Sequence, residues 1–503
     1  MTNTFNLSPN PLVRFLQKEP KEFTKSDLIY YISENNIEII NLRYVGADGR
    51  LKTLNFIIND LPHLDSILSY GERVDGSSLF PYIESGASDL YVIPRYRTAF
   101  LNPFSQIPSV DILCSYYTKD GKPLETAPEY TLRKAHQTFK RVTGMEFQAM
   151  GELEYYIVSK RDELFEAENQ RGYHESSPFC KWGDFRRKCM QAIAKTGGKI
   201  KYGHSEVGNF TLNDFSFEQN EIEFLPVDVE EAADQLLIAK WILRTLAYEH
   251  GLDLTFSPKI TTGKAGSGMH VHTKIVKDSR NMYVDGNGEL TNTALKTIAG
   301  FLDTASSLTA FGNTVPTSYF RLVPHQEAPT NICWGDRNRS VLVRVPLGWT
   351  SGAQQMITDA NPLEQPQSKA DVGNKQTVEF RCPDGSADIY LLMAGLTVAA
   401  RHGFEKRDAI EYAKERYVSV NIFSDEHKAT AEKLSHLPDS CTASAECLEQ
   451  QRSIYEQYQV FSPQLVDGLI KRLKSFDDSN LRRELENDEE KTLNLVRKYA
   501  NIG

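Results

Sequence analysis

The 503-residue sequence lacks any long hydrophobic run. A helix that crosses a membrane needs about 18 consecutive apolar residues, and no such stretch occurs. Residues 1–10 do not combine a charged start with an apolar stretch, so we expect no secretory signal peptide. These absences predict a cytoplasmic protein with no membrane partner.

The sequence also lacks a cysteine framework. Its seven cysteines are an odd number, and they form neither a C-x-x-C motif nor a Cys/His spacing typical of zinc sites. We therefore expect reduced thiols in a folded core, with no disulfides and no structural zinc.

Basic clusters are missing as well. Lys and Arg number 57 against 67 Asp and Glu, which gives a formal net charge of −10, and no strong basic block is present. Nucleic acids are bound through clustered Lys and Arg, so this balance argues against a nucleic-acid partner and favours small-molecule chemistry. A hydrophobic share of 40% is ordinary for a globular chain and excludes a mainly disordered one.

The first part of the chain is predicted to be rich in β-structure. Residues 37–58 alternate apolar and polar side chains on either side of the dipeptide Asp48-Gly49, which is a strong signal for a β-hairpin. We predict a small domain over residues 1–118.

The remainder mixes helical and β-like patterns. Residues 125–142 and 230–250 carry apolar residues at helical spacing, with shorter β-like runs among them. These patterns predict an α+β protein, with a larger domain over residues 119–503. Its charged tail, from about residue 424, is predicted to form solvated helices that pack on the same domain.

Four of the β-like segments each place two ionisable side chains two residues apart. In a strand such residues share one face, roughly 6 to 7 Å apart. The pairs are Glu152 with Glu154, Glu221 with Glu223, His270 with His272, and Glu379 with Arg381. One such pair is typical of a strand with a solvated face. Four pairs, rich in carboxylates and imidazoles, instead indicate a site for divalent cations.

The ligand types narrow the metal and the chemistry. Carboxylates with one or two histidines suit Mg²⁺ or Mn²⁺, whereas structural zinc favours thiolates or several imidazoles. Residues 321–346 add four arginines, which suit anionic substrates such as phosphates and carboxylates: Arg321, Arg337, Arg339 and Arg344. Surface arginines are the alternative, above all for Arg337. The combination favours metal-assisted phosphoryl transfer.

Taken in order, several segments resemble the glutamine synthetase family. They are DGSS from Asp75, GELE from Gly151, GSGMHVH from Gly266, SYFRLVPHQEAP from Ser318, NRSVLVRVP from Asn338 and VEFRCPDGSAD from Val378. The resemblance covers about residues 35–425. It implies a small β-grasp N-terminal domain and a large catalytic domain, whose curved antiparallel half-barrel sheet is flanked by helices. It further implies a homo-oligomer of stacked rings, a dodecamer, with active sites shared between neighbouring subunits.

The resemblance also implies the metal ligands. Two or more Mg²⁺ or Mn²⁺ ions are expected in each site. One set is Glu154, Glu206 and Glu221, and the other is Glu152, His270 and Glu379. Residues 209–217 resemble an insertion before Glu221. The match of Glu221 to a metal ligand of the family is therefore a prediction that the structure can test.

Roles around the substrates follow from the same resemblance. Asp75 and Ser78 are expected at an ammonium pocket together with Tyr173 and Glu206, and Asp75 is expected to deprotonate the ammonium. The remaining roles are a clamp for the amino-acid substrate by Arg321, Arg381 and Gly266, phosphate neutralisation by Arg339 and Arg344, a nucleotide contact by His272, and a flap carboxylate at Glu327 that shields the intermediate.

Three positions depart from the family pattern. Ala265 stands where an asparagine is usual, Thr377 stands where an arginine normally approaches phosphate, and Lys274 replaces a serine beside the expected adenine site. These departures concern substrate and nucleotide contacts.

The predicted activity is ATP-dependent formation of glutamine from glutamate and ammonia, through a γ-glutamyl phosphate intermediate. A first alternative keeps the intermediate but uses another amine, such as a polyamine or ethanolamine. A second alternative is a ring-forming regulatory or structural homologue without catalysis. The full set of six metal-ligand candidates argues against the second, and the ammonium-pocket residues favour ammonia over larger amines.

Overall fold

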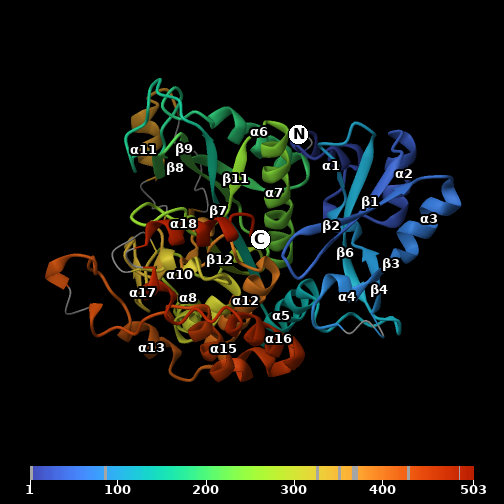
Figure 1. Cartoon of the computed structure of the whole chain (residues 1–503). Coiled ribbons are helices and arrows are strands. Elements are labelled where there is room, and N and C mark those ends of the chain that lie inside the picture. The colour runs from blue at the N-terminus through green and yellow to red at the C-terminus, as the bar shows by residue number, and fades with distance from the viewer. Residues whose placement is uncertain are drawn as a thin grey trace.

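The computed structural model describes residues 4–83, 86, 88–323, 328–348, 353–364, 372–427, 431–485 and 488–502. Over these residues the chain forms two separate sheets, each packed on its own main hydrophobic core (Figure 1). The N-terminal sheet (blue) lies to one side of the larger sheet, and the long helix α7 (Val229–Glu249) stands between them in this view.

The N-terminal domain is a mixed sheet with short helices on it, in the order β2-β1-β6-β4-β3, with β5 paired to β6. β1 and β2 form the predicted hairpin, in register from Ile39 opposite Ile57 to Val45 opposite Leu51, and Gly49 takes the positive φ of 73° that the turn requires. β1 then runs parallel to β6. The elements are α1 (Pro11–Leu16), α2 (Lys25–Glu34), β1 (Ile39–Val45), β2 (Leu51–Ile57), α3 (Leu61–Tyr70), β3 (Glu72–Asp75), α4 (Gly76–Leu79), β4 (Asp89–Pro94), β5 (Phe100–Leu101) and β6 (Ser109–Tyr117).

The larger sheet has the order β14-β15-β16-β12-β7-β9-β8, with β10 and β11 added along β7 and β13 along β12. Its pairs are antiparallel except β14 with β15, which are parallel. The strands are β7 (Glu146–Lys160), β8 (Ile200–Leu212), β9 (Phe215–Phe224), β10 (Val227–Asp228), β11 (Asp253–Thr255), β12 (Met269–Lys277), β13 (Arg280–Asn281), β14 (Trp334–Asp336), β15 (Val343–Val345) and β16 (Val378–Phe380).

Residues 209–217, which lengthen the connection before Glu221, form the outer end of the β8–β9 hairpin. Asn209 pairs with Glu218 and Leu212 with Phe215, so the extra residues extend the sheet. The register beyond them places Glu221 opposite both His204 and Glu154.

Helices cover one face of the larger sheet. Leu153 and Tyr155 of β7 are buried in the core with Leu236 of α7, and a Cβ on Gly151 would lie 2.8 Å from Leu236 Cδ1. The glycine therefore permits close packing of helix on strand. The helices of the domain are α5 (Pro128–Thr143), α6 (Gly183–Lys195), α8 (Asn292–Asp303), α9 (Ala305–Gly312), α10 (Ser318–Arg321), α11 (Ala353–Ala360), α12 (Ile389–Glu405) and α13 (Ala409–Glu415).

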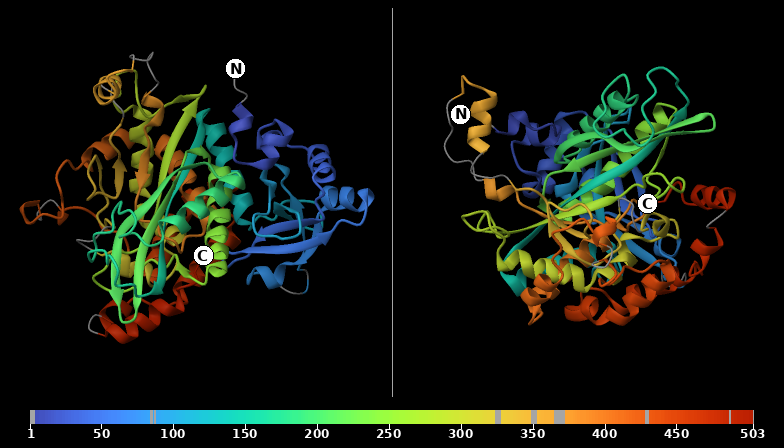
Figure 2. Two further views of the ribbon diagram at one scale, coloured as in Figure 1. Left: turned by 90° about the horizontal axis from the view of Figure 1, so that it is seen from above. Right: turned by 90° about the vertical axis from the view of Figure 1, so that its left-hand side faces the viewer.

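The first two C-terminal helices pack on the same core. Tyr455 and Val466 are fully buried and belong to the cluster that contains the sheet residues. Figure 2 shows the C-terminal helices (red) on the surface of the larger domain. They are α15 (Cys441–Glu456), α16 (Pro463–Lys474), α17 (Leu481–Glu484) and α18 (Glu489–Lys498).

A buried ion pair joins the two domains. Arg95, just after β4, donates hydrogen bonds to both carboxylate oxygens of Asp234 in α7, at 2.9 and 2.8 Å, and Tyr390 of α12 donates to the same carboxylate at 2.6 Å. All seven cysteines are free thiols, and all except Cys447 are buried. Within the described part of the chain, no helix has the length and apolar character needed to cross a membrane.

Candidate active site

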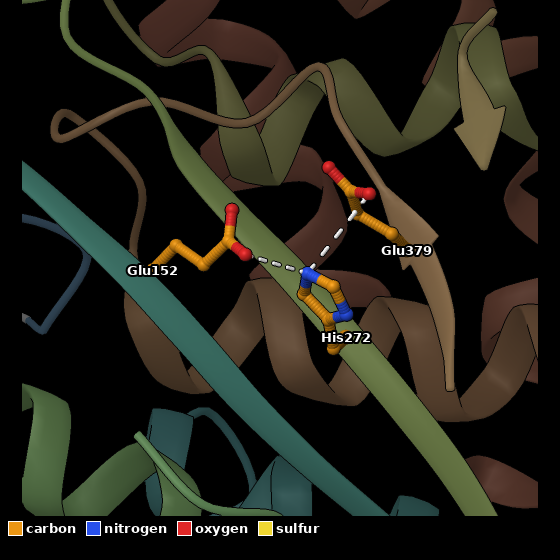
Figure 3. A group of neighbouring side chains, drawn as sticks. All are labelled: Glu152, His272 and Glu379. Carbon is orange, nitrogen blue, oxygen red and sulfur yellow. Dashed lines mark hydrogen bonds and ion pairs between the residues drawn. The ribbon is translucent and has the colours of Figure 1, made fainter. Parts of the chain in front are cut away.

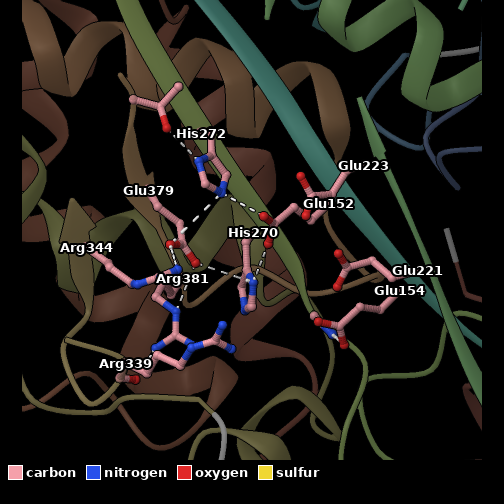
Figure 4. A network of polar contacts seen from close by, with 12 residues as sticks. Glu152, Glu154, Glu221, Glu223, His270, His272, Arg339, Arg344, Glu379 and Arg381 are labelled. Carbon is pink, nitrogen blue, oxygen red and sulfur yellow. Dashed lines mark hydrogen bonds and ion pairs between the residues drawn. The ribbon is translucent and has the colours of Figure 1, made fainter. Parts of the chain in front are cut away.

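Ionisable side chains gather on one face of the larger sheet (Figure 4). Leu153 of β7, Ile222 of β9 and Val271 of β12 lie in the helix-packed core, so the residues next to them project from the opposite face. Strand register places Glu152 opposite both Glu223 and His270, and Glu154 opposite Glu221. Four segments far apart in the sequence thereby form one cluster.

Glu152 lies at the centre of the cluster. Its Oε2 is 2.9 Å from His270 Nδ1, and its Oε1 is 2.8 Å from His272 Nε2. Glu379 approaches the same histidines, with Oε1 3.6 Å from His270 Nδ1 and Oε2 4.0 Å from His272 Nε2 (Figure 3 shows Glu152, His272 and Glu379).

The two histidines decide the protonation of Glu152. Burial by itself would raise the pKa of this carboxyl group, but the charge and hydrogen bonds of His272 and His270 hold the pKa well below its usual range. Glu152 acts on His272 in turn. Burial would lower the pKa of the His272 imidazole, but the charge and hydrogen bond of Glu152 raise it. This half of the cluster therefore favours the ionised form of Glu152.

The other half consists of carboxylates that repel one another. Glu154 is buried and accepts hydrogen bonds from the backbone N–H of Gly268 at 2.7 Å and from Gln219 Nε2 at 2.9 Å. Burial and the charge of Glu154 raise the pKa of Glu206 to about 8. Burial, Glu152 and Glu154 raise the pKa of Glu221 well above its usual range. A cation is the natural compensation for such a group.

The donor atoms fit a divalent metal. The ligand atoms of Glu152, His272 and Glu379 lie within 4.8 Å of one another, as do those of His204, Glu221 and Glu223. Oxygen donors with one imidazole in each group suit Mg²⁺ or Mn²⁺. The expected sets named His270 instead of His272 for the first group, and the structure places both histidines on Glu152.

His204 and Glu223 are absent from the expected ligand sets. His204 Nε2 lies 3.3 Å from Glu221 Oε1, while Glu223 accepts hydrogen bonds from Lys201 at 2.7 Å and from the Tyr202 hydroxyl. The sequence could have indicated His204, because it precedes Glu206 by two residues and such residues share one face of a strand.

Arginines border the cluster on the β15–β16 side. Arg344 Nη1 donates to Glu379 Oε2 at 2.9 Å, and Arg381 Nε donates to Glu379 Oε1 at 3.0 Å. Burial would raise the pKa of Glu379, but the charge of Arg381, followed by that of His272, holds this pKa below its usual value. Arg339 is exposed nearby, and its carbonyl accepts from Arg381. Arg337 points outward and pairs with Asp336, as the surface alternative predicted.

Arg321 and Gly266 meet at one end of the cluster. Arg321 is buried at the end of α10, donates to the carbonyl of Cys382 at 2.8 Å and places Nη2 3.4 Å from His270 Nε2. A Cβ on Gly266 would lie 2.4 Å from the Pro258 carbonyl oxygen and 3.0 Å from Arg321 Cγ, so the chain needs glycine here.

Asp75 and Ser78 lie elsewhere in the same chain. Asp75 caps α4 in the N-terminal domain and accepts hydrogen bonds from Ser78 Oγ at 2.6 Å and Ser77 Oγ at 2.7 Å, which lower the pKa of its carboxyl group. Figure 1 shows α4 on the opposite side of the molecule from β8 and β9. One chain therefore does not bring Asp75 to its own carboxylate cluster.

Tyr173 does lie beside the cluster. The segment that carries it runs along β8, because the backbone N–H of His174 donates to the Ser205 carbonyl at 2.9 Å. The Tyr173 ring stacks on His174, with centroids 4.1 Å apart, and approaches His204 at 5.5 Å, while 45% of its surface stays exposed. The expected flap residue Glu327 lies outside the described residues.

The three departures have definite contacts. The Thr377 hydroxyl lies 2.8 Å from His272 Nδ1, so the residue in the arginine position orients this histidine. The Ala265 carbonyl accepts from the Tyr156 hydroxyl at 2.8 Å, and its N–H donates to Gln170. Lys274 Nζ lies 3.4 Å from the Asn374 carbonyl oxygen.

The β-grasp sheet, the curved sheet and its cluster of carboxylates, histidines and arginines define the architecture of glutamine synthetases. Two sequence models agree: "Glutamine synthetase, beta-Grasp domain" matches residues 36–119, and "Glutamine synthetase, catalytic domain" matches residues 125–492. The chain belongs to the glutamine synthetase family.

Curated relatives and solved structures support this assignment. A glutamine synthetase of Thermus thermophilus is 30% identical over 397 residues, covering 76% of this chain and 81% of the relative. One of Methanococcus maripaludis is 30% identical over 431 residues, covering 83% and 88%. The fold is similar to a Plasmodium falciparum glutamine synthetase, with a TM-score of 0.74, 19% identity and coverage of 92% and 97%. It is also similar to GmaS without ligand, with a TM-score of 0.72, 19% identity and coverage of 92% and 100%.

Proposed function

We propose that this protein joins ammonia to the side-chain carboxylate of glutamate, driven by ATP and with γ-glutamyl phosphate as intermediate. The observation that supports this best is the juxtaposition of the Glu152–His270–Glu379 group with Arg344 and Arg381. A site with metal ligands on one side and arginines on the other suits transfer of a phosphoryl group to a carboxylate.

In this proposal the chain's own residues divide the work. Glu152, His270 and Glu379 hold one divalent ion, and Glu154, Glu206 and Glu221 hold another. Bound Mg²⁺ or Mn²⁺ would supply positive charge against the negative charge of the phosphates. Arg321 and Arg381, with Gly266, clamp glutamate, while Arg339 and Arg344 offset charge on the phosphoryl group and His272 contacts the nucleotide. Glu327 closes the site against water, because hydrolysis of the acyl phosphate would waste ATP.

The amine pocket is completed by a second subunit. Asp75 and Ser78 lie far from the cluster of their own chain, so Asp75 can deprotonate ammonium only in a neighbouring subunit's site, beside Tyr173 and Glu206. This requires a homo-oligomer, for which the stacked double ring of the family is the proposed form. The lowered pKa of Asp75 keeps its carboxylate ionised and able to attract a cation.

A larger amine is the second candidate. Tyr173 stacks on His174, which is tilted against His204 beside Glu221, and aromatic faces near carboxylates suit an alkylammonium ion. The pocket residues Asp75, Ser78, Tyr173 and Glu206 favour ammonium, because a small cation that donates four hydrogen bonds needs closely converging acceptors.

Phosphate release from ATP separates these candidates. The assay contains glutamate and adds ammonia, methylamine, ethanolamine, putrescine or spermidine one at a time. We expect the highest kcat/KM with ammonia, and we expect Asp75→Asn to lose amide formation more severely than acyl phosphate formation. A higher kcat/KM with a bulky amine would replace the glutamine assignment, and no amine-dependent turnover would support the non-catalytic alternative.

A further inference from the structure

Side chains of the curved sheet hold the backbone of residues 265–268. The Gly268 N–H donates to Glu154 Oε2 at 2.7 Å, and the Gly266 carbonyl accepts from Gln219 Nε2 at 2.9 Å. Gly266 belongs to the proposed clamp for the amino-acid substrate. The contacts of this backbone therefore decide where that substrate would meet the chain.

Ala265 is held in addition by a side chain from outside the sheet. It is 2% exposed, and its own side chain is only a methyl group. Its carbonyl accepts from the Tyr156 hydroxyl at 2.8 Å, and its N–H donates to Gln170 Oε1 at 2.7 Å. Gln170 lies in the connection between β7 and α6, and Lys264 Nζ reaches the same connection, 3.0 Å from Asn169 Oδ1. A buried N–H without an acceptor is costly, so Gln170 stabilises the position of Ala265.

The contact requires an acceptor from Gln170 and nothing more. A backbone N–H can only donate, so the side chain must turn an oxygen toward Ala265. The other end of the amide, Nε2, has a long contact of 3.5 Å with the Asn209 carbonyl oxygen. A carboxylate in place of the amide would keep the bond to Ala265, whereas an apolar side chain would remove it.

The backbone of residues 170–174 is held independently of the Gln170 side chain. A Cβ on Gly172 would lie 2.5 Å from the Glu206 carbonyl oxygen, so the segment runs closely against β8. Alternate N–H groups donate to β8 carbonyls in antiparallel order: Gln170 to Asn209 at 2.7 Å, Gly172 to Val207 at 3.3 Å and His174 to Ser205 at 2.9 Å. These backbone bonds fix Tyr173 beside β8, so a change in the Gln170 side chain leaves Tyr173 in place.

We infer that Gln170 is a positioning residue for the amino-acid substrate. The inference rests on the proposed function. Gln170 acts through Ala265 and keeps the next residue, Gly266, against Arg321, where a Cβ on Gly266 would lie 3.0 Å from Arg321 Cγ. Because backbone bonds hold Tyr173, the Gln170 side chain affects the amino-acid clamp and not the amine pocket.

Three variants of the full-length protein test this inference. Gln170→Met keeps the length of the side chain and removes the acceptor, whereas Gln170→Glu keeps an oxygen acceptor. The matched control is Arg171→Gln, because Arg171 is the next residue, is exposed and pairs with Glu168 at 3.4 Å. Melting temperatures verify folding. Gln170→Ala replaces Gln170→Met if the latter does not fold.

Two readouts are taken for each variant. Steady-state phosphate release gives kcat and the KM values for glutamate, ATP and ammonia, each varied with the other two in excess. Hydrogen exchange followed by mass spectrometry, without substrates, reports on the backbone of residues 262–268.

We expect Gln170→Met to raise the KM for glutamate about fivefold or more, as for a lost hydrogen bond that supports ground-state binding. Its kcat and its KM values for ATP and ammonia should stay within about twofold of the wild type. Exchange over residues 262–268 should be faster in Gln170→Met. Gln170→Glu and Arg171→Gln should resemble the wild type in both readouts.

An active wild type and a Gln170→Met variant with the same KM for glutamate would overturn the inference. Equal rises in all three KM values, or equal losses in Gln170→Met and Gln170→Glu, would also overturn it, since they indicate a general structural role. No glutamate-dependent phosphate release by the wild type would count against the proposed function instead. Hydrogen exchange alone would then decide whether Gln170 holds Ala265.

Discussion

Arg344 donates a hydrogen bond to Glu379 across the paired strands β15 and β16, with Nη1 2.9 Å from Oε2. The residue proposed to offset phosphate charge is thus bonded to a proposed metal ligand. Because Arg381 donates to the other oxygen of the same carboxylate, Glu379 orients both arginines toward the cluster. This places positive charge at the edge of the site before any substrate binds, which would lower the reorganisation needed for the proposed phosphoryl transfer.

Glu221→Gln should make the metal-free protein more stable while abolishing ligase activity. Burial and the charges of Glu152 and Glu154 raise the pKa of Glu221, so folding without metal favours its protonated form. Glutamine is neutral without taking up a proton, and we expect about 1 to 2 kcal/mol of added stability. Denaturant unfolding with a chelator present measures the gain, and phosphate release measures the loss. Glu163→Gln, at an exposed position, serves as a control for both readouts. Near-normal turnover in Glu221→Gln would contradict its role as a metal ligand.

Stability should fall with rising pH in the metal-free protein. The folded-state pKa of Glu206 is about 8, against an ordinary value of 4.5, so the folded state holds a proton that the unfolded state has lost. The contribution is fully present below about pH 4.5 and is lost as pH rises through about 8, at up to roughly 1 kcal/mol per pH unit.

Melting curves between about pH 5.5 and 8.5 measure this dependence. Mg²⁺ or Mn²⁺ should flatten it, because a cation binds the ionised carboxylates, and Glu206→Gln should flatten it without metal. A chelated wild type whose stability rises over this range would contradict the raised pKa.

Two inactive variants should restore activity when mixed. Asp75→Ala removes the proposed amine base, and Glu152→Ala removes a proposed metal ligand. If each site draws Asp75 from a neighbouring subunit, mixed oligomers contain some sites with both residues intact. Activity is measured after dissociation and reassembly of the two variants together and separately. Exchange of labelled subunits without recovered activity would argue against shared sites.

Breaking the Arg95–Asp234 pair should lower the free energy of unfolding more than replacing both residues with apolar ones. Arg95→Met removes two hydrogen bonds from the buried Asp234 carboxylate and leaves it with Arg97, 3.1 Å away, and Tyr390, so we expect about 1 to 3 kcal/mol of lost stability. The double variant Arg95→Met/Asp234→Leu should recover part of that loss, because it removes the under-compensated carboxylate. Denaturant unfolding of the single and double variants checks this relation. Equal losses in both would mean that packing, and not the charge of Asp234, sets the cost.

The sequence by itself determined which residues share a face of a strand. Alternation with a period of two places Glu152 with Glu154 and His270 with His272 whatever surrounds them, and the ligand types then indicate Mg²⁺ or Mn²⁺. A second local signal predicted the hairpin at Gly49, because the turn requires φ > 0 and glycine adopts it readily.

Only the tertiary structure decided which faces meet. The order β16-β12-β7-β9 depends on hydrogen bonds between strands far apart in the sequence, and it alone sets His270 against Glu152, 118 residues away, and Glu221 opposite Glu154. The buried pair of Arg95 and Asp234 likewise joins one domain to the other. Local propensities carry no information on such pairings, because they are selected by burying the opposite, apolar face of every strand at once.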